Sequence, residues 1–212
     1  MTECPFCCQE KKFTHTYFDD VKEKKCEAWI DYAKDHKDRL LWYALLNGDQ
    51  YTKGHTLLIL GSHRRKISDS SLTKLELGAL TVGLNKVANR LKDILHAEAV
   101  HVLSLCEGWE HLHFDLIPRY AYTDEEKKFY VDKYWDREKT RLAENGKRKW
   151  ASKGDFRKAA MKDDSIHGMW YAAYHEMKFK TSDFWKLCPK DRVKELEDRA
   201  KCLRDPNLPY PF

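Results

Sequence analysis

The chain has 212 residues, 42% of them hydrophobic and 13% aromatic, which is enough apolar material for a packed core and excludes global disorder. The net charge is +5, and the whole excess lies in residues 120–212, which hold 22 Lys and Arg against 17 Asp and Glu. No run approaches the roughly 20 apolar residues of a membrane span, and Met1-Thr2-Glu3-Cys4 lacks a signal pattern. We therefore expect a cytoplasmic protein with no membrane partner.

The seven cysteines are an odd number and most are scattered, which in a reducing compartment argues against a disulfide framework. The exception is Cys4-Pro5-Phe6-Cys7, whose spacing lets two thiolates reach one tetrahedral zinc ion. Two inert thiols are one alternative. A redox pair is another, although that role usually places the motif after a strand and at the start of a helix. The metal interpretation needs two more ligands, for which His63 and His111 are candidates; alone, His63 would be interpreted as an exposed loop histidine.

The first predicted elements lie between the cysteine motif and residue 36. Residues 13–18 are rich in threonine and aromatic side chains, a composition typical of a strand. Residues 24–36 place Trp29, Ile30 and Ala33 at helical spacing, which predicts a helix.

Two continuous apolar runs follow. Residues 40–46 and 55–60 have the length and composition of buried strands. The first run is followed by Asn47-Gly48-Asp49, which is turn chemistry, and the second ends at Gly61.

The clearest element is a helix predicted over residues 70–95, with Ser68, Asp69 and Ser70 as candidate caps at its start. A strand over residues 99–105 follows it. The apolar stripe of the helix has helical period and consists of Leu72, Leu75, Leu80, Leu84, Val87, Leu91 and Ile94.

Residues 111–116 alternate polar and apolar without a break, so a strand there places His111, His113 and Asp115 on one face. An ordinary solvated face would favour Thr, Lys or Ser. Two imidazoles and a carboxylate in line indicate a functional face, because histidine is a common metal ligand and acts as a nucleophile or base near neutral pH. The alternative is a surface strand with incidental histidines.

The order of these elements predicts an α+β fold, in which an antiparallel sheet carries helices on one face. We expect one domain over residues 1–120 and a helical C-terminal extension, residues 121–212, packed on it. A basic stretch over residues 147–158 has Glu144 just before it and Asp155 within it, so a solvated helix face is favoured over a phosphate or nucleic-acid patch. The helices of the extension are predicted at about 124–145, 155–162 and 190–203.

In four places the chain resembles the histidine-triad (HIT) superfamily of nucleotide hydrolases and transferases. The predicted long helix lies between the third and fourth matching pieces, as it does in that family. The resemblance covers about residues 1–120 and indicates the zinc-containing branch with a CxxC motif, here with an HxHxD variant of the triad. The matching pieces, in order, are Cys4-Pro5-Phe6-Cys7, Ala44-Leu45-Leu46-Asn47, Gly54-His55-Thr56-Leu57-Leu58-Ile59 with His63 following, and His111-Leu112-His113-Phe114-Asp115-Leu116-Ile117-Pro118-Arg119.

The resemblance implies covalent catalysis at a nucleotide α-phosphate. The central motif histidine falls on His113, which would attack phosphorus and form a nucleotidyl-histidine intermediate, because imidazole is nucleophilic when neutral. It also implies that His111 and His63 complete a structural zinc site with Cys4 and Cys7.

The nucleotide contacts implied by the resemblance are less complete. Asn47 falls where the family contacts the ribose, and an amide can hydrogen-bond a sugar hydroxyl; otherwise it is a turn residue. The family often has a phosphate-contacting serine where this chain has Gly108, whose backbone N–H could face a phosphate instead. Trp109 is a candidate to stack on a base or to pack. Asp115 replaces the usual third His or Gln. It would repel a phosphate unless it is protonated, it is paired with a cation, or the substrate binds in a different way; it is also a candidate general acid.

Three functions follow from this pattern. The first is a nucleotidyl hydrolase or transferase that works through His113 on a nucleotide or nucleotide conjugate. The second is a zinc-stabilised nucleotide-binding module in which Asp115 and Gly108 have replaced catalytic groups. The third is a relative that processes nucleic-acid ends through its basic extension. A homodimer is a further expectation from the family, which often dimerises through the sheet and the long helix.

Overall fold

The computed structural model describes part of the chain. Most of the predicted extension, including the basic stretch over residues 147–158, lies outside the described residues, as do Gly108 and Trp109. The described residues are 4, 6–7, 15–16, 25–26, 28–48, 50, 52–104, 110–121, 123–125, 128–129, 132, 189–205 and 207–208.

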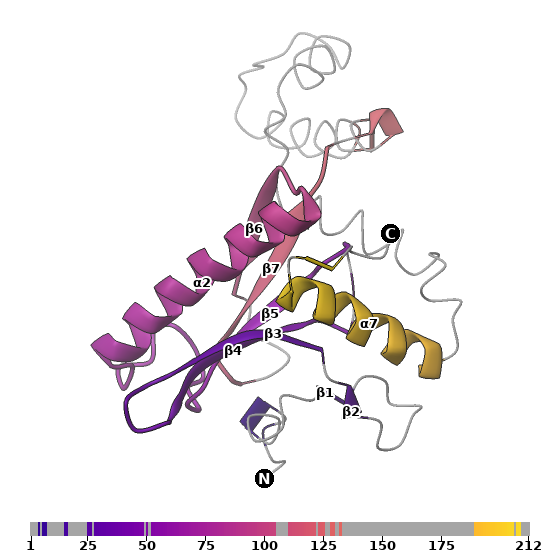
Figure 1. Ribbon diagram of the computed structural model, residues 1–212. Helices are drawn as coiled ribbons and strands as arrows, with labels where there is room; N and C mark the ends of the chain where they lie inside the picture. Colours follow the sequence, from indigo (N-terminus) through magenta and orange to yellow (C-terminus); the bar gives the residue numbers. More distant parts are fainter. Residues whose placement is uncertain are drawn as a thin grey trace, which may run out of the picture.

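A five-stranded antiparallel sheet forms the centre of the described fold, with strand order β3-β4-β5-β7-β6 (Figure 1). A long helix, α2, packs along it, which confirms the predicted α+β class with an antiparallel sheet and a long helix. Two short strands, β1 and β2, pair with each other as a separate ribbon. The strands are β1 His15–Thr16, β2 Lys25–Cys26, β3 Trp29–Lys34, β4 Leu40–Leu46, β5 Thr56–Leu60, β6 Ala99–Leu103 and β7 His113–Arg119.

The two apolar runs become the interior strands β4 and β5, as predicted. Every residue of β5 is buried, and so is β4 from Trp42 onward. Strands that are covered on both faces need apolar side chains at successive positions, which is why these two segments show continuous runs instead of alternation.

The helix predicted over residues 24–36 is wrong, because the structure forms β2 and β3 there. Trp29, Ile30 and Ala33 do have helical spacing, but β3, which contains all three, pairs with β4. The hydrogen bonds of that ladder, together with aromatic and β-branched side chains that suit a pleated surface, outweigh a weak local helical pattern.

Helix α2 runs from Lys74 to Leu95 and covers one face of the sheet. Its contact with β4 is close at Gly83, where a Cβ atom would lie 2.8 Å from the Trp42 ring. A larger residue at this position would therefore force the helix away from the sheet. The buried residues of α2 are Glu76, Leu80, Gly83, Val87, Leu91 and Leu95, so the predicted stripe is correct at its centre and shifted at its ends.

The predicted caps at Ser68, Asp69 and Ser70 are wrong, because Thr73 caps the helix. The Glu76 N–H donates to Thr73 Oγ1 at 3.1 Å, and the Thr73 N–H donates to Glu76 Oε2 at 2.7 Å. This reciprocal pair is a capping box, which satisfies two backbone donors that the first helical turn would leave unpaired.

Replacing Thr73 by alanine is expected to lower the free energy of unfolding by about 1 kcal/mol, because the capping oxygen is lost. Urea unfolding of both proteins at equal metal loading measures this difference. Thr73→Ser keeps the acceptor oxygen and serves as the control. An alanine variant as stable as the parent would show that the capping box adds nothing to the fold.

Helix α7, from Pro189 to Arg204, agrees with the helix predicted at 190–203 (Figure 1). It packs against β3 and also contacts α2 and β4. Arg204 fixes its end, because its guanidinium donates to the Trp29 carbonyl at 2.6 Å and lies 4.4 Å from the centre of the Trp29 ring. Among the described helices, none is long and apolar enough to cross a bilayer.

Candidate functional site

The polar residues of β7 lie on the sheet face opposite α2. Residues directly opposite each other in an antiparallel pair point to the same face. His113 lies opposite Ile59, which in turn lies opposite Tyr43. Since α2 packs on Trp42, whose side chain points the other way from Tyr43, His113 points away from the helix. Asp115 follows two residues later and shares this face, as predicted.

At the start of this face the structure brings together the four predicted metal ligands. Cys4 Sγ lies 3.3 Å from His111 Nδ1, and Cys7 Sγ lies 3.3 Å from His63 Nδ1 and 3.5 Å from His111 Nδ1. All four ligand atoms lie within 4.8 Å of one another. In tetrahedral zinc the usual bond lengths put sulfur and nitrogen about 3.5 Å apart, so these separations fit one zinc-sized ion.

The ring of His111 is oriented for metal binding through Nδ1. Its Nε2 lies 2.8 Å from the Leu60 carbonyl, an oxygen that can only accept, so Nε2 carries the proton and Nδ1 carries the lone pair. Burial lowers the pKa of His111 from 6.5 to about 4, against the opposing effect of this hydrogen bond. The imidazole is therefore neutral at pH 7, the form that binds metals.

The loop that carries His63 is fastened to the start of α2. Ser62 Oγ donates to Glu76 Oε1, and the guanidinium of Arg64 donates to the same oxygen at 3.1 Å. Burial opposes ionisation of Glu76, but the hydrogen bonds from Ser62 and Thr73 and the charge of Arg64 lower its pKa on balance. Glu76, which caps α2, therefore also binds Ser62 and Arg64, the two residues that flank His63.

His113 is 9% exposed, and one hydrogen bond determines its tautomer. Its Nδ1 lies 2.7 Å from the carbonyl oxygen of His111. Because that oxygen can only accept, Nδ1 bears the proton, and in the neutral ring the lone pair resides on Nε2. The backbone of one candidate metal ligand therefore orients the candidate nucleophile.

Asp115 pairs with a histidine that the sequence analysis did not assign to the site. His55 is fully buried, and its Nε2 lies 2.9 Å from Asp115 Oδ1. The strand ladder places Asp115 opposite Leu57, two residues after His55. The structure therefore gives Asp115 an imidazole partner, which would be the cation expected beside an aspartate near a phosphate only when its ring is protonated.

Asn47, the predicted ribose contact, directly follows β4 and lies beside this pair. Its Nδ2 lies 3.4 Å from both ring nitrogens of His55, and its backbone N–H donates to the His55 carbonyl at 2.8 Å. Gln50 Nε2 donates to the same carbonyl at 2.7 Å. His55 is thus held by its backbone as well as by its ring. A histidine at the start of a run that is otherwise almost entirely apolar was the signal in the sequence that could have identified it.

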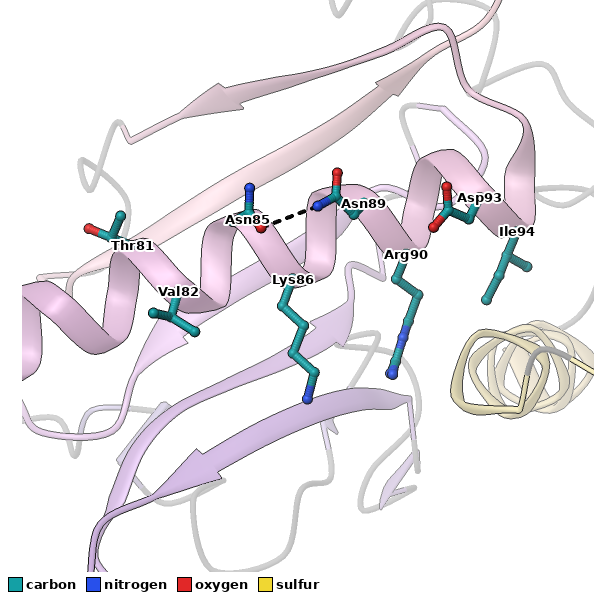
Figure 2. Close-up of a pocket in the computed structure, with 8 residues that line it drawn as sticks. All are labelled: Thr81, Val82, Asn85, Lys86, Asn89, Arg90, Asp93 and Ile94. Atoms are coloured by element: carbon teal, nitrogen blue, oxygen red, sulfur yellow. Dashed lines mark hydrogen bonds between the residues drawn. The ribbon is translucent and has the colours of Figure 1, made fainter.

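A hollow of about 750 Å³ lies along α2, on the other side of the sheet from these residues (Figure 2). Figure 2 shows Lys86 and Arg90 extending toward the strands, and both contact Asp31, at 2.8 and 3.2 Å. Asn89 donates to Asn85 at 3.2 Å along the helix. The two cations of this hollow are thus paired with Asp31, and its lining residues include no histidine or cysteine.

No protein-family model and no curated protein matches the chain. Similar solved structures include a Streptococcus mutans protein with 24% identity, covering 58% of this chain and 70% of that one at a TM-score of 0.43. A HIT family protein from Bacillus anthracis has 21% identity, 69% and 99% coverage and a TM-score of 0.42. A Zn-bound histidine triad family protein from Mycobacterium smegmatis has 17% identity, 57% and 78% coverage and a TM-score of 0.42. At these values, function has to be argued from the residues themselves.

Proposed function

We propose that the chain is a nucleotidyl hydrolase or transferase of the histidine-triad type, acting on a nucleotide α-phosphate through a covalent intermediate on His113. The observation that carries this proposal is the hydrogen bond from His113 Nδ1–H to the His111 carbonyl, at 2.7 Å. It holds a neutral imidazole in the tautomer whose Nε2 can attack. A nucleophile with its ring nitrogen oriented in this way is the arrangement that covalent catalysis requires.

In the first step, the Nε2 lone pair of His113 forms a bond to the α-phosphorus while the bond from phosphorus to the leaving group breaks. The leaving group takes the bonding electrons and needs a proton. In the second step, water or an acceptor hydroxyl attacks phosphorus, the bond to Nε2 breaks, and the imidazole regains its lone pair. Imidazole suits both steps because it is a good nucleophile and, once phosphorylated, a good leaving group.

The His55–Asp115 pair is the proposed proton source for the leaving group. A protonated His55 beside an ionised Asp115 carries no net charge, which removes the repulsion that a lone carboxylate would exert on a phosphate. Once the pair passes one proton to the leaving group, it is left with one negative charge. It can then take a proton from the attacking water in the second step, which is general acid and base catalysis by one group.

The metal cluster would have a structural role. Cys4, Cys7, His63 and His111 supply four protein ligands, a closed set that leaves no position for a reacting water. A zinc ion held there would tie the N-terminal segment to the loop after β5 and to the start of β7.

Nucleotide recognition is proposed for Asn47, through a ribose hydroxyl, and for Gly108 and Trp109, which lie outside the described residues. Asn47 is half-buried beside the His55–Asp115 pair, a position from which its amide could reach a sugar next to the reacting phosphate. The division into residues 1–120 and 121–212 and the homodimer stay predictions.

Intact-mass measurement after mixing the protein with a nucleoside phosphoramidate tests the proposal. The parent protein is expected to gain the mass of one nucleotidyl group. His113→Ala is expected to lose about a thousandfold or more in adduct formation, because no second nucleophile replaces it. His101→Ala is the matched control, since His101 lies on β6 on the same face of the sheet. Nucleotide binding with no adduct and no turnover in the parent protein would favour the binding-module function and reject the enzyme.

A further inference from the structure

Phe6 links the candidate metal site to the candidate nucleophile. It lies between Cys4 and Cys7 in the sequence and is 3% exposed. Its ring centre lies 5.6 Å from that of His111, edge-on, and 5.2 Å from that of His113, tilted by 52°. One aromatic side chain therefore packs on a metal ligand and on the imidazole proposed to attack phosphorus.

The backbone around Phe6 is held by the same short turn that presents the two thiols. The Cys7 N–H donates to the Cys4 carbonyl at 3.1 Å, which closes the turn. The Phe6 carbonyl accepts a hydrogen bond at 2.8 Å from the hydroxyl of Tyr43, a fully buried residue of β4. A metal ion bound to Cys4 and Cys7 fixes both ends of this turn and so fixes the position of the Phe6 ring between them.

His113 is also connected to the candidate metal site by a hydrogen bond. Its Nδ1–H donates to the carbonyl of His111, whose own ring nitrogen faces the thiols. The imidazole of His113 is thus positioned by two groups, the His111 carbonyl and the Phe6 ring, and both belong to residues that a bound metal would hold in place.

We propose that metal binding at Cys4, Cys7, His63 and His111 controls the position and accessibility of the His113 imidazole, with Phe6 as the positioning residue that transmits the effect. Loss of the metal frees the turn, the Phe6 ring leaves His113, and the imidazole becomes accessible without being correctly oriented. Any effect of this coupling on catalysis rests on the proposed function. The coupling itself concerns only how the side chains pack around His113.

Carbethoxylation by diethyl pyrocarbonate tests the inference, because this reagent reports on accessible neutral imidazoles and needs no nucleotide. Peptide mapping gives the rate at each histidine. In the parent protein, His113 is expected to react about tenfold faster after chelation than in the zinc-loaded form, since reactivity of a protected group follows the population of its open state. Fully buried His55 reports global unfolding and is expected to remain slow.

The decisive variant is Phe6→Leu in the zinc-loaded form, which keeps an apolar side chain and all four metal ligands. It is expected to hold one equivalent of zinc and to react several-fold faster at His113 than the zinc-loaded parent. After chelation, the His113 rate of the variant is expected to rise no higher than that of the chelated parent. Phe114→Leu is the matched control, because Phe114 is adjacent in sequence but points to the opposite face of β7. It is expected to leave the His113 rate unchanged.

Equal His113 rates in the zinc-loaded and chelated parent, or a Phe6→Leu variant with parental reactivity, would overturn the inference. So would His55 reacting in step with His113, which would indicate general unfolding. A failure of the proposed function looks different: no protein forms a nucleotidyl adduct, while the carbethoxylation rates still follow metal content and the residue at position 6.

Discussion

Replacing Cys4 by serine is expected to remove the bound metal and to lower the thermal unfolding temperature. Serine offers a neutral hydroxyl in place of a thiolate, the softer ligand that zinc prefers beside Cys7 and the two histidines. Losing a group that merely orients a ligand costs 10–100-fold in affinity, so losing a ligand is expected to cost at least about 100-fold.

Metal content after dialysis, measured by elemental analysis, and the unfolding temperature with and without a chelator check this result. A metal present at 1,000 times its Kd adds about 4 kcal/mol to stability, so chelation should shift the parent strongly and Cys4→Ser very little. Cys202→Ser is the matched control, because Cys202 is a buried cysteine on α7 and lies outside the cluster of candidate ligands. A parent protein that retains no metal, or a Cys4→Ser variant that retains a full equivalent, would contradict the zinc assignment.

Replacing Asp115 by asparagine is expected to slow adduct formation by about 100-fold when the leaving group is an alkoxide or an amine, the lower end of what a general acid contributes. The same substitution should have little effect with a nitrophenolate, which leaves without a proton. Asparagine keeps an oxygen that can accept from His55 Nε2, so the fold should be stable to within about 1 kcal/mol. Single-turnover rates with the two leaving groups measure the difference.

Asp31→Asn is the control for this substitution. Asp31 is also partly buried and paired, with Lys86 and Arg90, but it lies on β3 on the α2 side of the sheet. It should leave both rates unchanged. Equal slowing of both leaving groups by Asp115→Asn would show that the His55–Asp115 pair does not supply the proton to the leaving group. His55→Gln removes the other member of the pair and should reproduce the leaving-group dependence if the two residues act together.

The four metal ligands show how far a local pattern can predict a site. The spacing of Cys4 and Cys7 indicated half of a metal site, and the family resemblance supplied His63 and His111. The structure brings all four ligand atoms within 4.8 Å. Four ligand atoms gathered in this way suit a tetrahedral ion, and the bound zinc itself stays a prediction.

His55 shows where such reasoning stops. It is 60 positions from Asp115, and only the antiparallel register of β5 and β7 brings the two side chains to 2.9 Å. The helix prediction for residues 24–36 failed for a related reason. The pairing of β3 with β4 is a contact between different segments, which helical spacing within one segment cannot reveal. The cap at Thr73 was different, because its Thr-x-x-Glu spacing was present in the sequence and is a recognised helix start.

Local sequence patterns were thus sufficient to predict the most regular elements: the apolar runs of β4 and β5, the long helix α2, and the alternation that places His113 and Asp115 on one face. These follow from local periodicity and burial, which a single segment can display. The contacts that those side chains make could be read only from the folded chain. The partnership of Asp115 with His55, the tautomer of His113 and the position of Phe6 depend on strand register and on the turn between two cysteines, because atoms distant in the chain must be brought within hydrogen-bonding or packing distance.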